Sequence, residues 1–230
     1  MMKSIEIVHT LKQSLVLTLI AMVALLSVYL VAEPRVGQAI YDQFTISQTV
    51  TAEISFLATA NNVTMSPSLA GITGGTSNGS TQVRVMTNNA TGYSMSITAS
   101  SSPALQGNSQ GGEFQDYTEA SAGTPDFTFS VGSNTAEFAY SVKATTTSDV
   151  DPTFRDNGTN TCATGSSNTA GACWYGLSTS PETIINRATE TPASGATTTI
   201  FFRAQITANP SPAVPADTYV ATTTLTAVTN

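Results

Sequence analysis

The sequence predicts an all-β protein: an antiparallel β-sandwich of the immunoglobulin-like, Greek-key kind that follows an N-terminal apolar helix. Apolar and polar side chains alternate with a period of two in several short segments, as expected of strands with one buried face. Thr is frequent, and β-branched side chains lose rotamer freedom in helices but pack well on pleated sheets. Loops rich in Gly, Ser and Asn separate the segments, a pattern typical of sandwiches. A barrel is the alternative.

The N-terminal segment predicts export from the cytoplasm. Lys3 and Lys12 precede an unbroken apolar run from Leu15 to Ala32. A cleaved signal peptide has this order of basic and apolar residues, followed by small residues at the cut. We therefore place a cut after Ala39, with a cut after Ala32 as the second choice.

The same apolar run also fits a retained anchor. Its roughly 18 residues just suffice to cross about 30 Å of hydrocarbon, and the basic flank would keep the N-terminus inside. Either way the remainder becomes an extracellular or cell-surface protein, secreted or tethered by the helix. We expect residues 1–39 to be a signal peptide or membrane anchor, and residues 40–230 to form a single β-sandwich domain.

Charge is scarce in this chain. Charged residues make up 10% of the 230 residues, and the formal net charge is -7. The positive side chains beyond Ile40 are far apart in the sequence: Arg84, Lys143, Arg155, Arg187 and Arg203. Because no basic patch can be read from this spacing, we expect no nucleic-acid partner, and membrane contact only through Leu15 to Ala32.

Catalysis is the function that the sequence disfavours most. The single histidine, His9, precedes the apolar run, so no Ser/His or Cys/His arrangement can form in the exported part. A pair of carboxylates could act as in a glycosidase, but no motif singles out two of the acids. We expect a protein that is not an enzyme, with no catalytic residue and no cofactor unless calcium binds.

The longest alternation runs from Phe44 to Phe56. Every even position in it is apolar except Gln48, and Thr, Ser and Glu fill the odd positions. A continuous strand of this length would span about 40 Å at roughly 3.3 Å per residue. It either bends near Gln48 or extends beyond its own domain. A strand of the second kind can complete the sheet of a neighbour, so it is our candidate for self-assembly or for contact with other envelope proteins.

Shorter alternations predict the remaining strands. We expect a hairpin from residues 83–85 and 93–99, joined by the turn at 87–92. Further strands are expected at residues 127–131, 138–142, 200–206 and 218–228. Only residues 181–188 favour a helical turn, because Pro181 and Glu182 suit a helix N-terminus.

The two cysteines predict a disulfide. Cys162 and Cys173 enclose a polar loop, and an oxidising compartment favours their pairing. A bridge of this span would stabilise the fold by about 3 kcal/mol in the chain-entropy model. Trp174 and Tyr175 follow directly, and exposed aromatic side chains commonly stack on sugars. Packing of Trp174 on the disulfide and the core is the other interpretation.

One cluster of oxygen-bearing side chains suggests calcium. Its members are Asp149, Asp151, Asp156, Asn157 and Asn160. Calcium takes six to eight such oxygens, although Phe154 stands where an EF-hand loop needs Gly. A solvated turn, with Arg155 neutralising an acid, is the alternative.

Two stretches resemble bacterial cell-surface sandwich proteins, including fimbrial subunits and WxL-type wall-binding domains. They are Thr87 to Ile97 (TNNATGYSMSI) and Pro215 to Val228 (PADTYVATTTLTAV). The WxL signature itself is absent, because Trp174 and Leu177 are separated by one residue too many. The resemblance implies surface display or assembly and transfers no binding residue.

The sequence therefore predicts a non-enzymatic, exported cell-envelope or surface protein that serves as a structural or assembly subunit of pilin-like kind. A glycan- or wall-polymer-binding module, with adhesion as its role, is the alternative. In that case the contacts would come from the loops around Trp174 and residues 149–160.

Overall fold

The computed structural model describes residues 2–31 and 40–230. The chain divides into two units, Met1–Thr49 and Val50–Asn230, so the β unit begins ten residues beyond the predicted boundary at Ala39. The proposed cuts after Ala32 and Ala39 lie outside the described residues and stay predictions.

The first unit contains one helix, α1 (Met2–Val31). Its stretch from His9 to Val31, 23 residues with a mean hydropathy of 2.6, is long and apolar enough to cross a membrane. The predicted apolar helix is thus confirmed for residues up to Val31. A helix of this length near the N-terminus fits a signal sequence and a membrane anchor alike.

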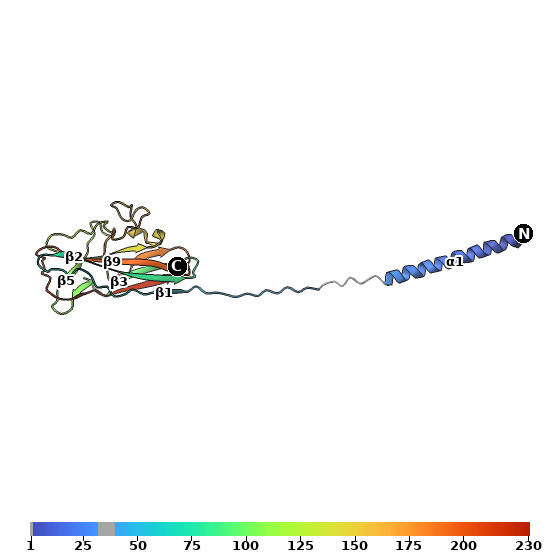
Figure 1. Cartoon of the computed structure of the whole chain (residues 1–230), viewed down its shortest axis with the longest axis horizontal. Coiled ribbons are helices and arrows are strands. Elements are labelled where there is room, and N and C mark those ends of the chain that lie inside the picture. Colours follow the sequence, from blue (N-terminus) through green and yellow to red (C-terminus); the bar gives the residue numbers. More distant parts are fainter. Residues whose placement is uncertain (1, 32–39) are drawn as a thin grey trace. The chain divides into compact units, whose positions relative to one another are not determined.

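The second unit consists of two sheets (Figure 1). The eight-stranded sheet has the order β1 (Ile54–Ala58), β2 (Gly75–Thr87), β9 (Ala196–Ile206), β6 (Ala136–Ala144), β5 (Glu113–Asp116), β4 (Leu105–Gly107) and β10 (Tyr219–Val220), with β7 (Tyr175–Gly176) also paired to β6. The three-stranded sheet has the order β11 (Thr223–Thr229), β3 (Tyr93–Ala99) and β8 (Glu182–Arg187). Two short 3₁₀ helices, η1 (Thr147–Asp149) and η2 (Pro152–Phe154), follow β6.

The strand pairing is mixed. Most neighbours are antiparallel, but β5 and β6 are parallel, with Gln115 opposite Glu137. The prediction of a purely antiparallel fold is therefore wrong at this pair. Since β5 and β6 are separated by residues 117–135, the chain has enough length to cross back and enter β6 in the same direction.

One hydrophobic core takes side chains from both sheets. Alternate residues of β3 are fully buried, and so are alternate residues of β9. They belong to a single cluster that includes Val83, Val85, Tyr93, Met95, Ile97, Val142, Ile185, Ile200, Phe202 and Ile206. The period-two pattern in the sequence is thus the pattern of burial. The predicted strands at residues 138–142, 200–206 and 218–228 are confirmed as β6, β9 and the pair β10 and β11.

Two predicted local structures are wrong. Residues 83–85 and 93–99 do not form a hairpin, because β2 and β3 belong to different sheets and the turn at 88–92 carries the chain from one to the other. Both strands bury one face in the same core, so the alternation alone cannot distinguish the two arrangements.

The predicted helical turn at residues 181–188 is also wrong, since this segment is β8. Met95 pairs with Ile185 and Ser96 with Thr183, which leaves Ile184 as the extra residue of a bulge. Ile184 and Ile185 are therefore both buried, and two consecutive buried residues interrupt the period of two.

A further correction concerns residues 127–131, where no strand forms. Phe129 is buried, but it packs with Trp174 in a second, smaller cluster outside the main core. The neighbouring Asp126 makes only a single bridge, to Trp174.

The long strand predicted from Phe44 to Phe56 is present only from Ile54. Residues 40–53 have no regular secondary structure, and all of their side chains are exposed.

Candidate functional site

The predicted disulfide is confirmed: Cys162 and Cys173 are bonded, and both are buried. Such a bond suggests a non-reducing environment. The loop that it closes packs back on its own start, where the buried Asp156 pairs with Cys162 and Ser167 through backbone bridges. The bridge thus holds together a loop of small polar residues that contributes little to the core.

Trp174 lies inside the protein. It is 1% exposed and contacts Phe129, with ring centroids 5.6 Å apart. Its Nε1 donates a hydrogen bond to the carbonyl of Gly171 at 2.9 Å, and the Arg203 guanidinium lies 4.4 Å from the ring centroid. The prediction of a sugar contact by Trp174 is therefore not supported by its position, because packing and a cation–π contact occupy the ring.

Tyr175 is half-buried on the main core. Its ring packs edge-on against Phe154 at 5.8 Å and against Tyr140 at 6.3 Å. The side chain is thus an anchor of β7 rather than a free aromatic surface for stacking.

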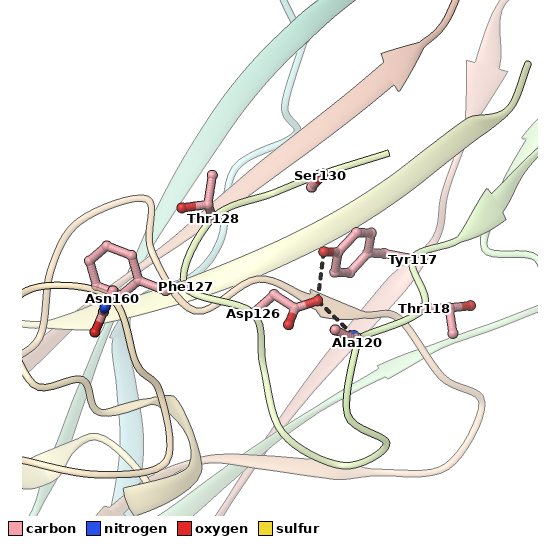
Figure 2. Close-up of a pocket in the computed structure, with 8 residues that line it drawn as sticks. All are labelled: Tyr117, Thr118, Ala120, Asp126, Phe127, Thr128, Ser130 and Asn160. Atoms are coloured by element: carbon pink, nitrogen blue, oxygen red, sulfur yellow. Dashed lines mark hydrogen bonds between the residues drawn. The ribbon is translucent and has the colours of Figure 1, made fainter. Parts of the chain in front are cut away.

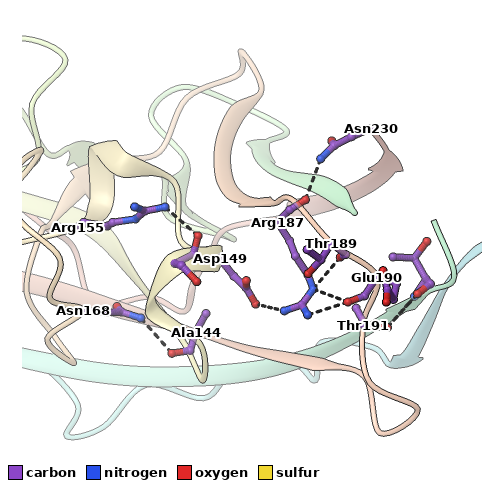
Figure 3. Close-up of polar contacts among 11 residues, drawn as sticks. Ala144, Asp149, Arg155, Asn168, Arg187, Thr189, Glu190, Thr191 and Asn230 are labelled. Carbon is purple, nitrogen blue, oxygen red and sulfur yellow. Dashed lines mark hydrogen bonds and ion pairs between the residues drawn. The ribbon is translucent and has the colours of Figure 1, made fainter. Parts of the chain in front are cut away.

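The calcium candidates are dispersed among separate contacts. Asp149 forms an ion pair with Arg187, 2.6 Å between Oδ2 and Nη1 (Figure 3). Arg187 also donates to the carbonyls of Thr189 and Glu190, and so it joins η1 to the end of β8. Asp151 caps η2 by accepting a hydrogen bond from the Thr153 amide at 3.0 Å.

Asp156 and Asn157 satisfy their own loop. The Asp156 carboxylate, 1% exposed, accepts from the amides of Gly158 and Thr169 at 2.7 Å each. The Asn157 Oδ1 accepts from three following amides, including that of Asn160 at 3.0 Å.

These contacts engage the candidate calcium ligands within the fold, and the calcium site stays a prediction. Within residues 2–31 and 40–230, no group of three or more His, Cys, Asp or Glu side chains lies close enough together to hold a metal ion. The sequence cluster is thus a set of turn and loop contacts, with Arg187 rather than Arg155 neutralising an acid. Arg155 instead donates to the carbonyls of Val150 and Ser148.

Asn160 contributes to a shallow polar hollow of about 410 Å³ (Figure 2). Thr118, Thr128, Ser130 and Asp126 also line it. The Tyr117 hydroxyl donates to Asp126 at 2.8 Å, and burial together with this hydrogen bond raises the pKa of Tyr117. No sequence pattern predicts this hollow, because its residues come from an irregular stretch that we expected to be partly a strand.

A different kind of site precedes β1. Residues 44–52 are here called the exposed segment. They have the predicted alternation of apolar and polar residues, but their side chains are exposed. Phe44, Ile46 and Val50 are 80%, 84% and 80% exposed. No charged residue or proline interrupts the exposed segment, which lies between Asp42 and Glu53.

The chain is clamped where the exposed segment meets the β unit. The Glu53 amide donates to Asn88 Oδ1 at 2.7 Å, and Asn88 Nδ2 donates to the Thr51 carbonyl at 3.1 Å. The Thr87 hydroxyl donates to the Glu53 carbonyl at 2.6 Å. These bonds fix the direction in which the chain enters β1.

Comparison with known proteins gives no relative: no protein-family model, no curated protein and no solved structure matches this chain. The resemblance of residues 87–97 and 215–228 to bacterial surface proteins remains a prediction. Function is therefore argued from the exposed segment, the sheet edges and the polar hollow.

Proposed function

We propose that this protein is a non-enzymatic, exported cell-envelope protein that serves as a structural or assembly subunit, pilin-like in that copies join through strands. The observation that carries this proposal is the exposed segment itself. It has the side-chain pattern of a half-buried strand, yet its large apolar side chains are exposed.

The energetics favour burial of the exposed segment in a complex. Fully burying a side chain of the size of Phe44, Ile46 or Val50 gains about 1.5–3 kcal/mol. An uncharged segment without proline is also suited to strand pairing, which natural proteins usually prevent with charge or proline. Retaining such a segment in exposed form is consistent with a binding function.

The rest of the molecule supports export and display. α1 fits a signal sequence or anchor, and the disulfide suits an oxidising compartment. We propose that the two sheets face each other as a sandwich, since side chains of both enter one core. Such a domain would present the exposed segment on a rigid support.

Assembly is tested with the full chain purified in detergent. We expect ordered oligomers whose mass rises with protein concentration in sedimentation velocity. Replacing the apolar row (Phe44→Ser, Ile46→Ser and Val50→Ser together) should give monomers. The matched control replaces the hydroxyl row (Thr45→Ala, Ser47→Ala and Thr49→Ala) and should assemble like the wild type. A wild type that stays monomeric at every concentration would overturn the proposal.

A second candidate function is binding of a glycan or wall polymer. The polar hollow favours it, because residues with hydroxyl, amide and carboxylate groups line it together with Phe127 (Figure 2). On a glycan array we expect the wild type to bind and Asn160→Ala with Thr128→Ala to lose the signal. Absence of binding by the wild type would remove this candidate.

A further inference from the structure

The sheet edges of this protein differ in how well they are protected against pairing. β8 follows Pro181, carries charged residues at both ends and contains the bulge at Ile184. β1 has an irregular register after Phe56, and β10 consists of only two residues. Bulges, charges, proline and short length are the devices that block unwanted strand addition.

β11 has none of these devices. Its seven residues, Thr223–Thr229, pair with β3 in unbroken register, and they include no charged residue and no proline. The other side of β11, here called the β11 edge, pairs with no strand among the described residues. Val228 on this strand is 51% exposed.

We propose that the β11 edge accepts the exposed segment of a second copy of this chain. This inference rests on the proposed assembly function and names its acceptor. Both partners are uncharged, rich in Thr and alternate with the same period, so apolar side chains can face the core while Thr side chains pair outside.

The surroundings of the β11 edge fit such an addition. β1 and β11 lie next to each other, one from each sheet. Their core-facing side chains along this side are only half-buried: Ile54 and Phe56 on β1, Leu225 and Ala227 on β11. An added strand would cover them with its own apolar row and complete the burial.

The hydrogen bonds at Thr51 and Glu53 oppose pairing of the exposed segment with β11 of the same copy. β1 starts opposite Thr87, and β11 ends opposite Tyr93, so both meet the turn at 88–92 and run in opposite directions. To reach its own β11, the exposed segment would have to reverse direction at residues 51–53. That reversal breaks the hydrogen bonds of Thr51 and Glu53 to Asn88, whereas binding by a second copy leaves them intact.

One test places a positive charge on the β11 edge of the full chain. Thr226→Lys is expected to weaken self-association at least about tenfold, since an unpaired charge on the edge opposes strand addition. Thr183→Lys on β8 is the matched control, because it is the same exposed substitution on the opposite edge of the same sheet, and it should assemble normally.

A second test identifies the contact directly. Full chains carrying Ser47→Cys and Thr226→Cys are mixed under mild oxidation, and we expect a disulfide-linked heterodimer. Ser47→Cys mixed with Thr183→Cys should give none.

The outcomes separate this inference from the assembly proposal. If Thr226→Lys assembles normally and no cross-link forms, while the apolar-row variant is monomeric, the acceptor lies elsewhere and only this inference falls. If the double variant Ser47→Cys/Thr226→Cys closes a disulfide within one monomer, the chain occupies its own edge and the inference is wrong. If the wild type does not assemble, the proposed function falls as well.

Discussion

The exposed segment and strand β9 carry the same alternation of apolar and hydroxyl side chains but lie in opposite surroundings. β9 is hydrogen-bonded on both sides, to β2 and to β6, and Ile200 on it is 1% exposed. In the exposed segment, Ile46 is 84% exposed. The difference shows that alternation encodes the ability to bury one face, and that the available neighbours decide whether burial occurs within the chain.

Position along the chain explains the two outcomes. β9 follows β2 and β6 in the sequence, and it pairs with both of them over most of their length. The exposed segment ends at the hydrogen bonds of Thr51 and Glu53. The edge of β2 that follows these bonds is occupied by β1. We therefore propose that its pairing capacity serves another molecule.

Proline substitutions should break this comparison with the largest effect. Thr199→Pro in β9 should lower the free energy of unfolding by about 3–5 kcal/mol or prevent folding. The reason is that a central strand has no position without a ladder hydrogen bond. Thr49→Pro in the exposed segment should stay within about 0.5 kcal/mol. Urea unfolding of the full chain in detergent, followed by the fluorescence of the single, buried Trp174, measures both. A loss of stability in Thr49→Pro as large as in Thr199→Pro would mean that the exposed segment is part of the folded β unit.

Removing one matched apolar side chain from each region sharpens the comparison further. Ile200→Ala should cost about 2–5 kcal/mol, because it leaves a cavity in the core. Ile46→Ala should leave the free energy of unfolding within about 0.5 kcal/mol while weakening self-association. The same unfolding assay, run at a concentration where the wild type is monomeric, gives both values. Equal costs for the two substitutions would contradict the difference in burial.

The sequence predicted β3 and β9 from their strict alternation, because their burial follows the same period. It failed where tertiary structure breaks the period. The bulge at Ile184 puts two adjacent side chains in the core, and Phe129 is buried in a cluster that requires no strand. It also assigned β2 and β3 to a hairpin, since the sheet to which a strand belongs is not encoded in its own pattern.

The candidate site was predictable only in part. The disulfide followed from two cysteines and a predicted export signal, and it is present. The partner of Asp149 was not predictable, because Arg187 lies 38 residues away and is brought near by the pairing of β8. The polar hollow joins Asn160 to a loop more than thirty residues earlier, a proximity that only the folded chain creates.

Two tyrosines extend the comparison to pH, with the smallest effect. Tyr140 in β6 is fully buried opposite Phe202 of β9, whereas Tyr41, just before the exposed segment, is 82% exposed. Burial, with a smaller contribution from Glu182, raises the pKa of Tyr140 well above its ordinary value. The folded state therefore favours the neutral phenol, and this contribution to stability is present below a pH of about 10 and is lost as the pH rises above it.

We expect Tyr140→Phe to change stability by no more than about 1 kcal/mol at neutral pH and to flatten the alkaline decline measured by urea unfolding between about pH 9 and 11. Tyr41→Phe is the control and should follow the wild type throughout. Parallel curves for Tyr140→Phe and the wild type would show that the Tyr140 hydroxyl gains access to water without disturbing the fold.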